Sequence, residues 1–363
     1  MRRHVVLIAP PWYPVPPHGY GGIELVVALL DEGLRARGHN VTLFGAEGSA
    51  PGTMVEAPRT WCADLGRPDE RLRQLTYAAR VVEELRELGP IDVIHDHSGF
   101  ATLLGAAVVE VAPVVHSVHG AIGEPDRSYY QSLGDRVGLV AISKTQRSTA
   151  PDLHWIGTVH NAVDIRHLRT ASPDEKQPFL LCLARICPDK GQHLAIEVAR
   201  RTGMRLALAG KIEQTPQGIE YYERQIAPAV DGDRVIHVYN VGGEEKAALL
   251  ARATALLAPI QWDEPFGLAM VEAMVSGTPV VAFSRGAVRE LVTHGETGFV
   301  VADVDEMVTA TRRVGDIDLV ACAQVARDRF GPEAMTDGYL RLYESVIKTP
   351  SVAVGATKGT TAA

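Results

Sequence analysis

Short apolar runs recur along the whole chain, and longer stretches that are apolar on one side only separate them. A run that is apolar throughout is typical of a parallel strand covered on both faces. The segments expected to be strands, some of which include polar residues, are residues 5–9, 41–44, 91–95, 114–120, 138–143 and 158–164 in the first half, and 179–184, 205–210, 235–239, 255–259, 280–283 and 298–301 in the second. Between them, leucine recurs at helical spacing, as in residues 23–37. Strands and helices therefore alternate, which predicts an α/β fold.

A polar stretch at residues 169–178 separates the two halves of this pattern. A chain of 363 residues is long enough for two domains with separate cores. We therefore expect two Rossmann-like, doubly wound domains, residues 1–168 and 179–330, joined by that linker and separated by a cleft. We also expect a helix over 331–348 that packs back on the first domain, and a disordered tail over 349–363.

Composition and charge exclude several classes of protein. The hydrophobic share of 46% and the charged share of 22% are usual for a globular protein, and the net charge of −8 argues against a nucleic-acid partner. The apolar run near the start is broken by Pro10-Pro11, which argues against a signal peptide, and no run reaches the length of a membrane span. The cysteines are scattered, at Cys62, Cys182, Cys187 and Cys322. We therefore expect a cytoplasmic protein without disulfides.

Two loops carry groups that suit a phosphate. Glycines at residues 19–22 follow the first strand, where a phosphate could approach the backbone, although an ordinary flexible turn is the alternative. Their spacing does not fit G-x-G-x-x-G, which disfavours a dehydrogenase. Arg185 and Lys190 share the loop after the strand at 179–184. Two cations near a helix start suit a diphosphate, and a solvated surface pair is the alternative.

Histidines follow two strands of the first half. His119 could bind a polar ligand or move a proton, and the alternative is a core histidine with satisfied hydrogen bonds. His95 and His97 lie two residues apart with Asp96 between them, which invites a metal interpretation. The chain offers no obvious third and fourth ligand, so we expect no metal site.

The stretch after the strand at 255–259 holds two carboxylates. Glu264 lies in the loop, Gly267 precedes a helix, and Glu272 follows about two turns later. Both carboxylates can therefore face one crevice at the carboxyl end of a parallel sheet. They could act as acid and base, accept hydrogen bonds from the hydroxyls of a sugar and a ribose, or be ordinary charges on a helix.

From about residue 4 to residue 347 the chain resembles glycosyltransferase family 4, a family of retaining enzymes with the GT-B fold. The most specific match runs from Glu264-Pro265-Phe266-Gly267-Leu268 to Glu272 and looks like the family's E-x7-E element. Arg185 and Lys190 look like its Arg-x4-Lys pair. Weaker matches are Tyr20-Gly21-Gly22 with Glu24, His119, residues 295–299, and Asn161 with Asp164. The chain departs from the family pattern at Ala162 and Ala184, where glycine is usual.

The resemblance implies roles for these residues. Glu264, with backbone N–H groups near Phe266 to Leu268, would hold the donor sugar, and Glu272 the ribose. The cations would stabilise the leaving diphosphate. The catalytic residues expected on this basis are His119, Arg185, Lys190 and Glu264, and the donor-binding residues are Gly21, Gly22, Arg185, Lys190, Phe266, Gly267, Leu268 and Glu272. The family retains the anomeric configuration and needs no metal.

We therefore expect a metal-independent enzyme of the hexosyltransferase type. It would move a sugar from a nucleoside-diphosphate sugar, which is a substrate and not a cofactor, to an unidentified small-molecule, glycan or lipid-linked acceptor. The rival hypotheses are a sugar-nucleotide epimerase or phosphorylase with the same fold, and a sensor that binds sugar nucleotides without turnover. The helix expected over residues 72–88 mixes arginine with glutamate, which is typical of a solvated face and argues against membrane contact.

Overall fold

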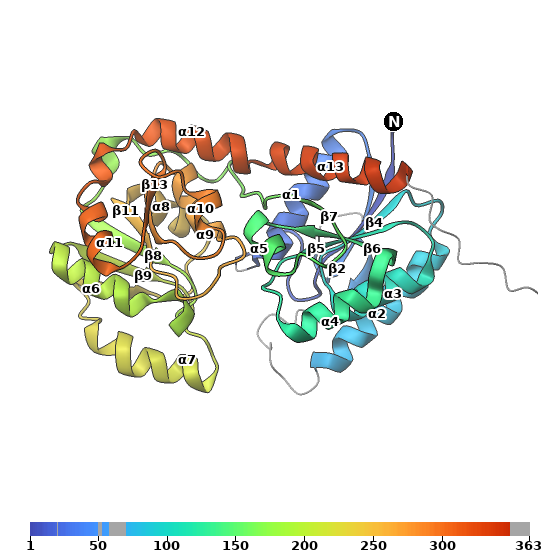
Figure 1. Cartoon of the computed structure of the whole chain (residues 1–363), viewed down its shortest axis with the longest axis horizontal. Helices are drawn as coiled ribbons and strands as arrows, with labels where there is room; N and C mark the ends of the chain where they lie inside the picture. Colours follow the sequence, from blue (N-terminus) through green and yellow to red (C-terminus); the bar gives the residue numbers. More distant parts are fainter. Residues whose placement is uncertain (20, 50–52, 58–69, 349–363) are drawn as a thin grey trace, which may run out of the picture.

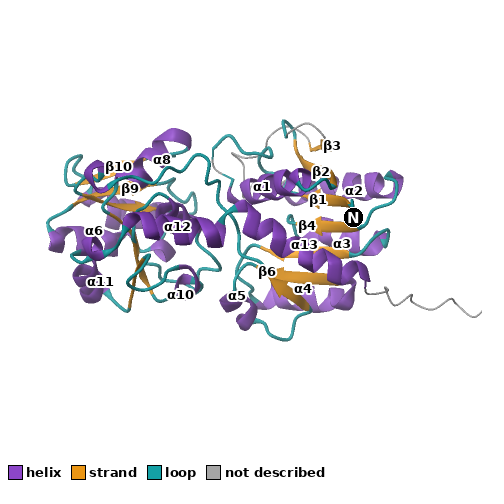
Figure 2. Ribbon diagram, turned by 90° about the horizontal axis from the view of Figure 1, so that it is seen from above, coloured by secondary structure: helices purple, strands orange, loops and turns teal. Residues whose placement is uncertain are grey.

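The computed structural model describes residues 1–19, 21–49, 53–57 and 70–348, with the backbone alone at 53–57. Two α/β lobes lie side by side (Figure 1), and each contains one parallel sheet with helices on both faces (Figure 2). The predicted α/β, GT-B-like architecture of two Rossmann-like units is therefore confirmed. Tyr20, Trp61, Cys62 and the tail at 349–363 lie outside the described residues. In the described part of the chain, no helix is both long enough and apolar enough to cross a membrane.

The first lobe is built on seven strands in the order β3-β2-β1-β4-β5-β6-β7. They are β1 (His4–Ile8), β2 (Asn40–Ala46), β3 (Thr53–Ala57), β4 (Val93–Asp96), β5 (Val114–Val118), β6 (Val137–Ala141) and β7 (Trp155–Thr158). The helices of this lobe are α1 (Gly22–Ala36), α2 (Glu70–Glu87), α3 (Phe100–Val109), α4 (Glu124–Leu133) and α5 (Lys144–Thr149). Alternate residues of β1 enter different cores, since Val6 and Ile8 pack on one face of the sheet and Val5 and Leu7 on the other. This two-sided burial explains why the strand is apolar throughout.

The second lobe is built on six strands in the order β10-β9-β8-β11-β12-β13. They are β8 (Phe179–Leu183), β9 (Arg205–Ala209), β10 (Val235–Val238), β11 (Ala255–Ala258), β12 (Val280–Phe283) and β13 (Gly298–Val301). Its helices are α6 (Gln192–Thr202), α7 (Pro216–Tyr221), α8 (Gly243–Arg252), α9 (Leu268–Val275), α10 (Val288–Leu291), α11 (Val304–Thr311) and α12 (Leu319–Phe330). Short 3₁₀ segments lie at Gly134–Arg136, Pro173–Glu175, Pro188–Lys190, Ala227–Ala229 and Val314–Asp316, and a π-helical segment follows α7 at Tyr222–Ile226.

Each sheet reverses its strand order at its first strand. β1 lies between β2 and β4, and β8 lies between β9 and β11. At such a reversal, the loops after the two neighbouring strands run to opposite faces of the sheet. They leave a crevice at the carboxyl ends of the strands, which is where doubly wound folds bind ligands. The loops that carry the predicted glycines, cations and carboxylates all leave these strands.

The last helix, α13 (Pro332–Lys348), returns to the first lobe and packs on α1. It follows α12 directly, so the two helices run along both lobes in turn (Figure 1). Tyr339 and Tyr343 of α13 are fully buried in the core of the first lobe. Gly33 of α1 has no room for a side chain, because Thr336 of α13 occupies that space.

Some predicted elements are wrong. The segment at 158–164, expected to be a strand, does not form one, because β7 ends at Thr158. Ala162 and Val163 are nevertheless buried, and the Val163 N–H donates to the carbonyl oxygen of Phe330 at the end of α12 instead of to a strand. Between β9 and β10 the chain is not a single regular helix, since α7 begins at Pro216 and gives way to π- and 3₁₀-helical turns.

Candidate active site in the cleft between the lobes

Glycine-rich loops of the two lobes touch at the cleft. A Cβ atom added to Gly22, the first residue of α1, would lie 3.0 Å from Cδ1 of Leu268, the first residue of α9. A Cβ atom on Gly242, which precedes α8, would lie 3.8 Å from Cα of Gly19. The amino-terminal ends of α1, α8 and α9 therefore gather at one place between the lobes.

None of these three helix starts is capped by the side chain of the residue that precedes it. The first N–H groups of a helix have no partner within the helix, and they carry the positive end of its dipole. Three such ends around one cleft make a binding site for an anion. Glycine precedes each helix, at Gly21, Gly242 and Gly267, which lets a ligand approach the backbone closely.

A lysine, a carboxylate and an indole ring lie together on the second-lobe wall of the cleft. Lys190 Nζ forms an ion pair with Glu264 Oε2. Trp262 Nε1 donates to the same oxygen at 2.8 Å, and Lys190 Nζ lies 5.1 Å from the centre of the Trp262 ring. The structure thus brings together Lys190 and Glu264, two residues predicted for the site. The lysine is positioned by a carboxylate and by the face of an aromatic ring.

The local backbone holds this pair in place. The N–H of Gln261 donates to the carbonyl oxygen of Asp189 at 2.8 Å, which ties the lysine loop to the loop after β11. Gly191 adopts a left-handed conformation with φ 67°, and a side chain there would collide with the carbonyl oxygen of Pro259. The N–H of Ala287 donates to the carbonyl oxygen of Glu264 at 2.9 Å. Both charged side chains therefore project from rigid loops.

Arg185 stands apart from this pair. Its side chain is 50% exposed, and its Nη1 lies 3.2 Å from Oε1 of Glu213. The main chain of Arg185 is fixed, because its carbonyl oxygen accepts a hydrogen bond of 2.9 Å from Nε2 of Gln192. The guanidinium is consequently exposed enough to exchange its surface partner for a ligand.

Glu272 lies in the second turn of α9 and is buried. Its Oε1 lies 2.6 Å from Nζ of Lys246, which comes from the first turns of α8. This lysine was not predicted from the sequence, although it follows the Gly242-Gly243 pair that opens the helix. Each of the two carboxylates of the E-x7-E element therefore carries its own lysine.

Phe266 has a different environment from its predicted neighbours. Its side chain is buried, with its ring centre 5.8 Å from that of His160 and 6.0 Å from that of Phe330. A ligand in the cleft could meet only its backbone. Gly267, with φ 116°, turns the chain into α9 just after it.

On the first-lobe wall, Glu24 is a buried carboxyl group in the first turn of α1. Burial raises the pKa of Glu24 to about 7, although hydrogen bonds from the backbone of Glu24 and Tyr13 lower it in part. A Cβ atom on Gly21 would lie 3.2 Å from Oε2 of Glu24, so the Glu24 carboxyl group packs directly against the glycine loop.

His119 follows β5 and is half-buried. Its Nε2 lies 2.9 Å from Nδ1 of His97, which follows the adjacent strand β4. Gln146 fixes the turn around His119, since its Nε2 donates to the carbonyl oxygens of Val118 and Gly120 at 2.7 Å each. Among the described residues, no cluster of histidine, cysteine and acidic side chains has the arrangement of a metal site.

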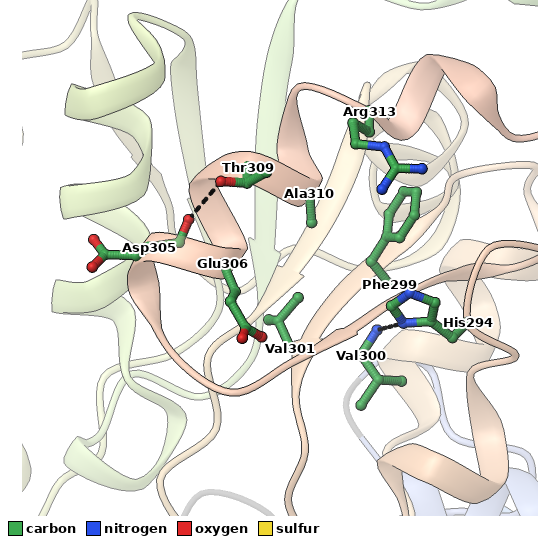
Figure 3. A pocket seen from close by; sticks show the side chains of 9 residues that line it. All are labelled: His294, Phe299, Val300, Val301, Asp305, Glu306, Thr309, Ala310 and Arg313. Atoms are coloured by element: carbon green, nitrogen blue, oxygen red, sulfur yellow. Dashed lines mark hydrogen bonds between the residues drawn. The ribbon is translucent and has the colours of Figure 1, made fainter.

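Another hollow lies away from these residues, between α11 and β13 of the second lobe (Figure 3). Its volume is about 320 Å³. Arg313 lies over the ring of Phe299 at 5.3 Å, and Nδ1 of His294 accepts a hydrogen bond of 3.2 Å from the Val300 N–H. None of the predicted catalytic or donor-binding residues lines this pocket.

Two family models match the chain, one over each lobe. The family model described as Glycosyltransferase Family 4 matches residues 20–167, and the model described as Glycosyl transferases group 1 matches residues 165–314. The chain is 31% identical over 302 residues to the MMP alpha-(1->4)-mannosyltransferase of Mycolicibacterium hassiacum, which covers 72% of this chain and 70% of that protein. It is 27% identical to the D-inositol 3-phosphate glycosyltransferase of Frankia alni, over 92% of this chain and 97% of that protein.

Solved structures are similar over nearly the whole chain. AviGT4, a glycosyltransferase involved in avilamycin A biosynthesis, has a TM-score of 0.70 and 28% identity and covers 95% of this chain and 98% of its own. HepE of Anabaena in complex with UDP-glucose has a TM-score of 0.72 and 20% identity and covers 95% of this chain and 100% of its own. At that identity, the second likeness shows the fold alone.

Proposed function

The chain belongs to glycosyltransferase family 4 and takes its sugar from a nucleotide sugar, and from that premise we propose a specific reaction. A hexosyl group passes from a nucleoside-diphosphate sugar to a hydroxyl group of an acceptor, with retention of configuration at the anomeric carbon and without a metal ion. Lys190 and Arg185 stabilise the diphosphate that leaves.

One observation carries this proposal. Three uncapped helix starts and Lys190 surround one cleft between the lobes. When the bond to the sugar breaks, negative charge develops on the diphosphate, and donors already fixed around it lower the barrier. Fixed N–H groups and cations can serve where other transferases use a metal ion for the same charge.

The ion pairs of the second lobe suggest how the donor is received. Lys190 is held by Glu264 before the donor arrives, and a bound diphosphate takes over this lysine as its counter-ion. Glu264 is then released to accept hydrogen bonds from hydroxyl groups of the donor sugar. On α9, Glu272 accepts hydrogen bonds from the ribose hydroxyls, while Lys246 compensates its buried charge.

The bond changes balance within the two substrates. The bond between the anomeric carbon and the diphosphate oxygen breaks, and its electron pair stays on the diphosphate. The acceptor oxygen bonds to the anomeric carbon on the face from which the diphosphate departs, and its proton passes to the leaving phosphate. The configuration is therefore retained, and no covalent sugar–enzyme intermediate forms.

Release of nucleoside diphosphate from a panel of nucleotide sugars tests the proposal. We expect Lys190→Ala to lower kcat by roughly 10²–10³-fold, as loss of one fixed donor to a developing charge does. Arg185→Ala should lower it less, because its side chain is 50% exposed. Arg200→Ala is the matched control, since this arginine is 72% exposed and pairs with Glu197 on its own helix.

Two results would contradict the proposal. If Lys190→Ala and Arg185→Ala both turn over as fast as Arg200→Ala does, the diphosphate site is elsewhere. If the donor is isomerised without an acceptor, or if turnover requires free phosphate, the enzyme is an epimerase or a phosphorylase and not a transferase.

A further inference from the structure

A buried and a half-buried histidine ring share a hydrogen bond at the carboxyl ends of adjacent strands. Nδ1 of His97, after β4, lies 2.9 Å from Nε2 of His119, after β5. The rings are stacked, with centres 5.2 Å apart and planes at 23°. His97 is 3% exposed, and its Nε2 is a buried nitrogen without a hydrogen-bond partner. The distribution of protons between the two rings decides what His119 can offer to a substrate.

Both imidazoles are neutral at ordinary pH. Burial lowers the pKa of His97 well below its usual value, and the neighbouring rings of His95, His119 and His116 lower it further. Burial, with a smaller effect of His116, lowers the pKa of His119 to about 3. Asp96, the nearby acid, directs its carboxylate to His116 and not to this pair, with 2.9 Å between Oδ1 and Nδ1. Each ring of the pair therefore carries one proton.

A bond between two neutral imidazoles needs one N–H and one lone pair, which leaves two arrangements. If His119 donated from Nε2, the proton of His97 would lie on its own Nε2, which is buried without a partner. If His97 donates from Nδ1, only a lone pair of His97 remains unpartnered. Buried N–H groups without partners are rarer than buried acceptors without partners. The second arrangement is therefore favoured.

The proton of His119 must then lie on Nδ1. This nitrogen has no hydrogen-bond partner among the described residues, and it is not one of the buried unpartnered atoms in that part of the chain. It is thus accessible, at the carboxyl end of the first sheet where the cleft opens. His119 therefore offers an N–H to a ligand at the carboxyl end of the first sheet and has no lone pair to spare.

We infer that His97 is a positioning residue, which holds His119 as a neutral hydrogen-bond donor to an oxygen atom of the bound sugar. This inference rests on the proposed transfer reaction for the identity of the ligand. The inference excludes proton transfer, one of the roles that the sequence left open for His119. A ring that accepts a hydrogen bond at Nε2 and donates one from Nδ1 cannot accept the proton of the acceptor hydroxyl.

Nitrogen-15 NMR of the histidine side chains tests the inference without any substrate. In the wild-type protein with labelled histidine, we expect His119, assigned with His119→Gln, to carry its proton on Nδ1 throughout the range of about pH 5–8. His97→Asn keeps a donor near the position of Nδ1 and should preserve this tautomer. His97→Leu removes the donor, so Nε2 of His119 should become protonated in part and the ring should titrate at higher pH.

Kinetics distinguish a positioning role from a structural one. We expect His97→Leu to lower kcat about 10–100-fold, the size of effect known for partners that orient metal-binding histidines, and His97→Asn to recover most of it. Melting temperatures of both variants show whether folding is affected. A wild-type His119 protonated on Nε2 would overturn the inference. Absence of transferase turnover with the expected tautomer would instead contradict the proposed reaction.

Discussion

The two carboxylates of the E-x7-E element are each paired with a lysine from another part of the chain. Glu264 pairs with Lys190, and Glu272 with Lys246. Burying a carboxylate without a counter-charge is costly, and in each pair the lysine supplies that counter-charge before any ligand arrives. A bound diphosphate can then take Lys190 from Glu264, and the released carboxylate accepts hydrogen bonds from hydroxyl groups of the donor sugar. The ion pairs therefore place the charged groups of the site in position before the donor binds.

The pair of Lys246 and Glu272 leads to a prediction about stability. We expect Lys246→Met to lower the free energy of unfolding by about 1–3 kcal/mol, because Glu272 is left buried without its counter-charge. Glu272→Gln in the same chain should restore most of the loss, since the buried charge is gone. Denaturant unfolding of the two single variants and the double variant measures the coupling. Strictly additive effects would show that the pair is not coupled.

The residues of this site were predictable to different degrees. The strand–loop–helix context of Glu264 and Glu272 could be read from the sequence, because the apolar run, the glycine and the helix follow one another locally. The ion pair of Lys190 with Glu264 joins residues 74 positions apart, which no local pattern reveals. The bond between His97 and His119 also depends on the pairing of β4 with β5. Partners brought together by the fold remained beyond sequence reasoning.

At the scale of elements, strands were predicted better than the helices of the first lobe. The runs that became β1 and β12 are buried on both faces and therefore apolar throughout. The helix α3 was not expected, because its sequence FATLLGAAVV has no polar side. Its inner face packs on α2 and the sheet, while Leu104 and Val108 are exposed on its outer face. Helical periodicity is lost when a helix is apolar all round.

A second contact between the lobes, separate from the cleft residues, joins the start of α5 to α10. Glu290 of α10 accepts hydrogen bonds from the N–H groups of Lys144 and Thr145 at 2.8 Å and 2.6 Å and from Oγ1 of Thr145 at 2.6 Å. His160 Nε2 lies 3.5 Å from the same carboxylate. Burial alone would raise the pKa of Glu290, but these hydrogen bonds outweigh burial and lower it to about 2. Glu290 thus joins the lobes as an anion.

This contact predicts a dependence of stability on pH. Because the pKa of Glu290 is lower in the folded state than its ordinary value of 4.5, the stabilisation is fully present above about pH 4.5 and is lost as the pH falls towards about 2. We expect Glu290→Gln to remove this part of the acid sensitivity and to lower the free energy of unfolding by about 1–2 kcal/mol at neutral pH. Melting temperatures across this pH range measure the acid sensitivity of each variant. Glu306→Gln, in the exposed first turn of α11, is the control. Equal acid sensitivity of both variants would contradict the assignment.

At the scale of the whole molecule, two sheets meet through a few loops and one pair of helices. The continuous path of α12 and α13 connects the second lobe to the core of the first (Figure 1). Across the cleft, two close approaches lie at the donor site: Gly22 approaches Leu268, which packs on the apolar cores of both lobes, and Gly19 approaches Gly242. A cleft lined by such small contacts can open and close around a ligand, as two-domain enzymes commonly do.

The approach of Gly22 to Leu268 makes closure testable. A methyl group on Gly22 would lie 3.0 Å from the leucine side chain, which is closer than about nine in ten contacts of this kind, whereas Gly89 has open space around it. We expect Gly22→Ala to hold the lobes apart and to weaken nucleoside-diphosphate binding by roughly tenfold, about 1.4 kcal/mol. The expected melting temperature without ligand is close to that of the wild type, since the clash is at the cleft and not in a core. Gly89→Ala is the matched control.

Small-angle scattering with and without nucleoside diphosphate separates closure from simple loss of a contact. The wild type and Gly89→Ala should become more compact on binding, and Gly22→Ala should do so less at saturating ligand. Leu268→Ala combined with Gly22→Ala supplies the missing space and should restore compaction. If Gly22→Ala compacts as the wild type does but binds more weakly, the glycine serves the approach of the phosphate to the helix start and not the movement of the lobes. The double variant then gains nothing, because space against Leu268 was never limiting.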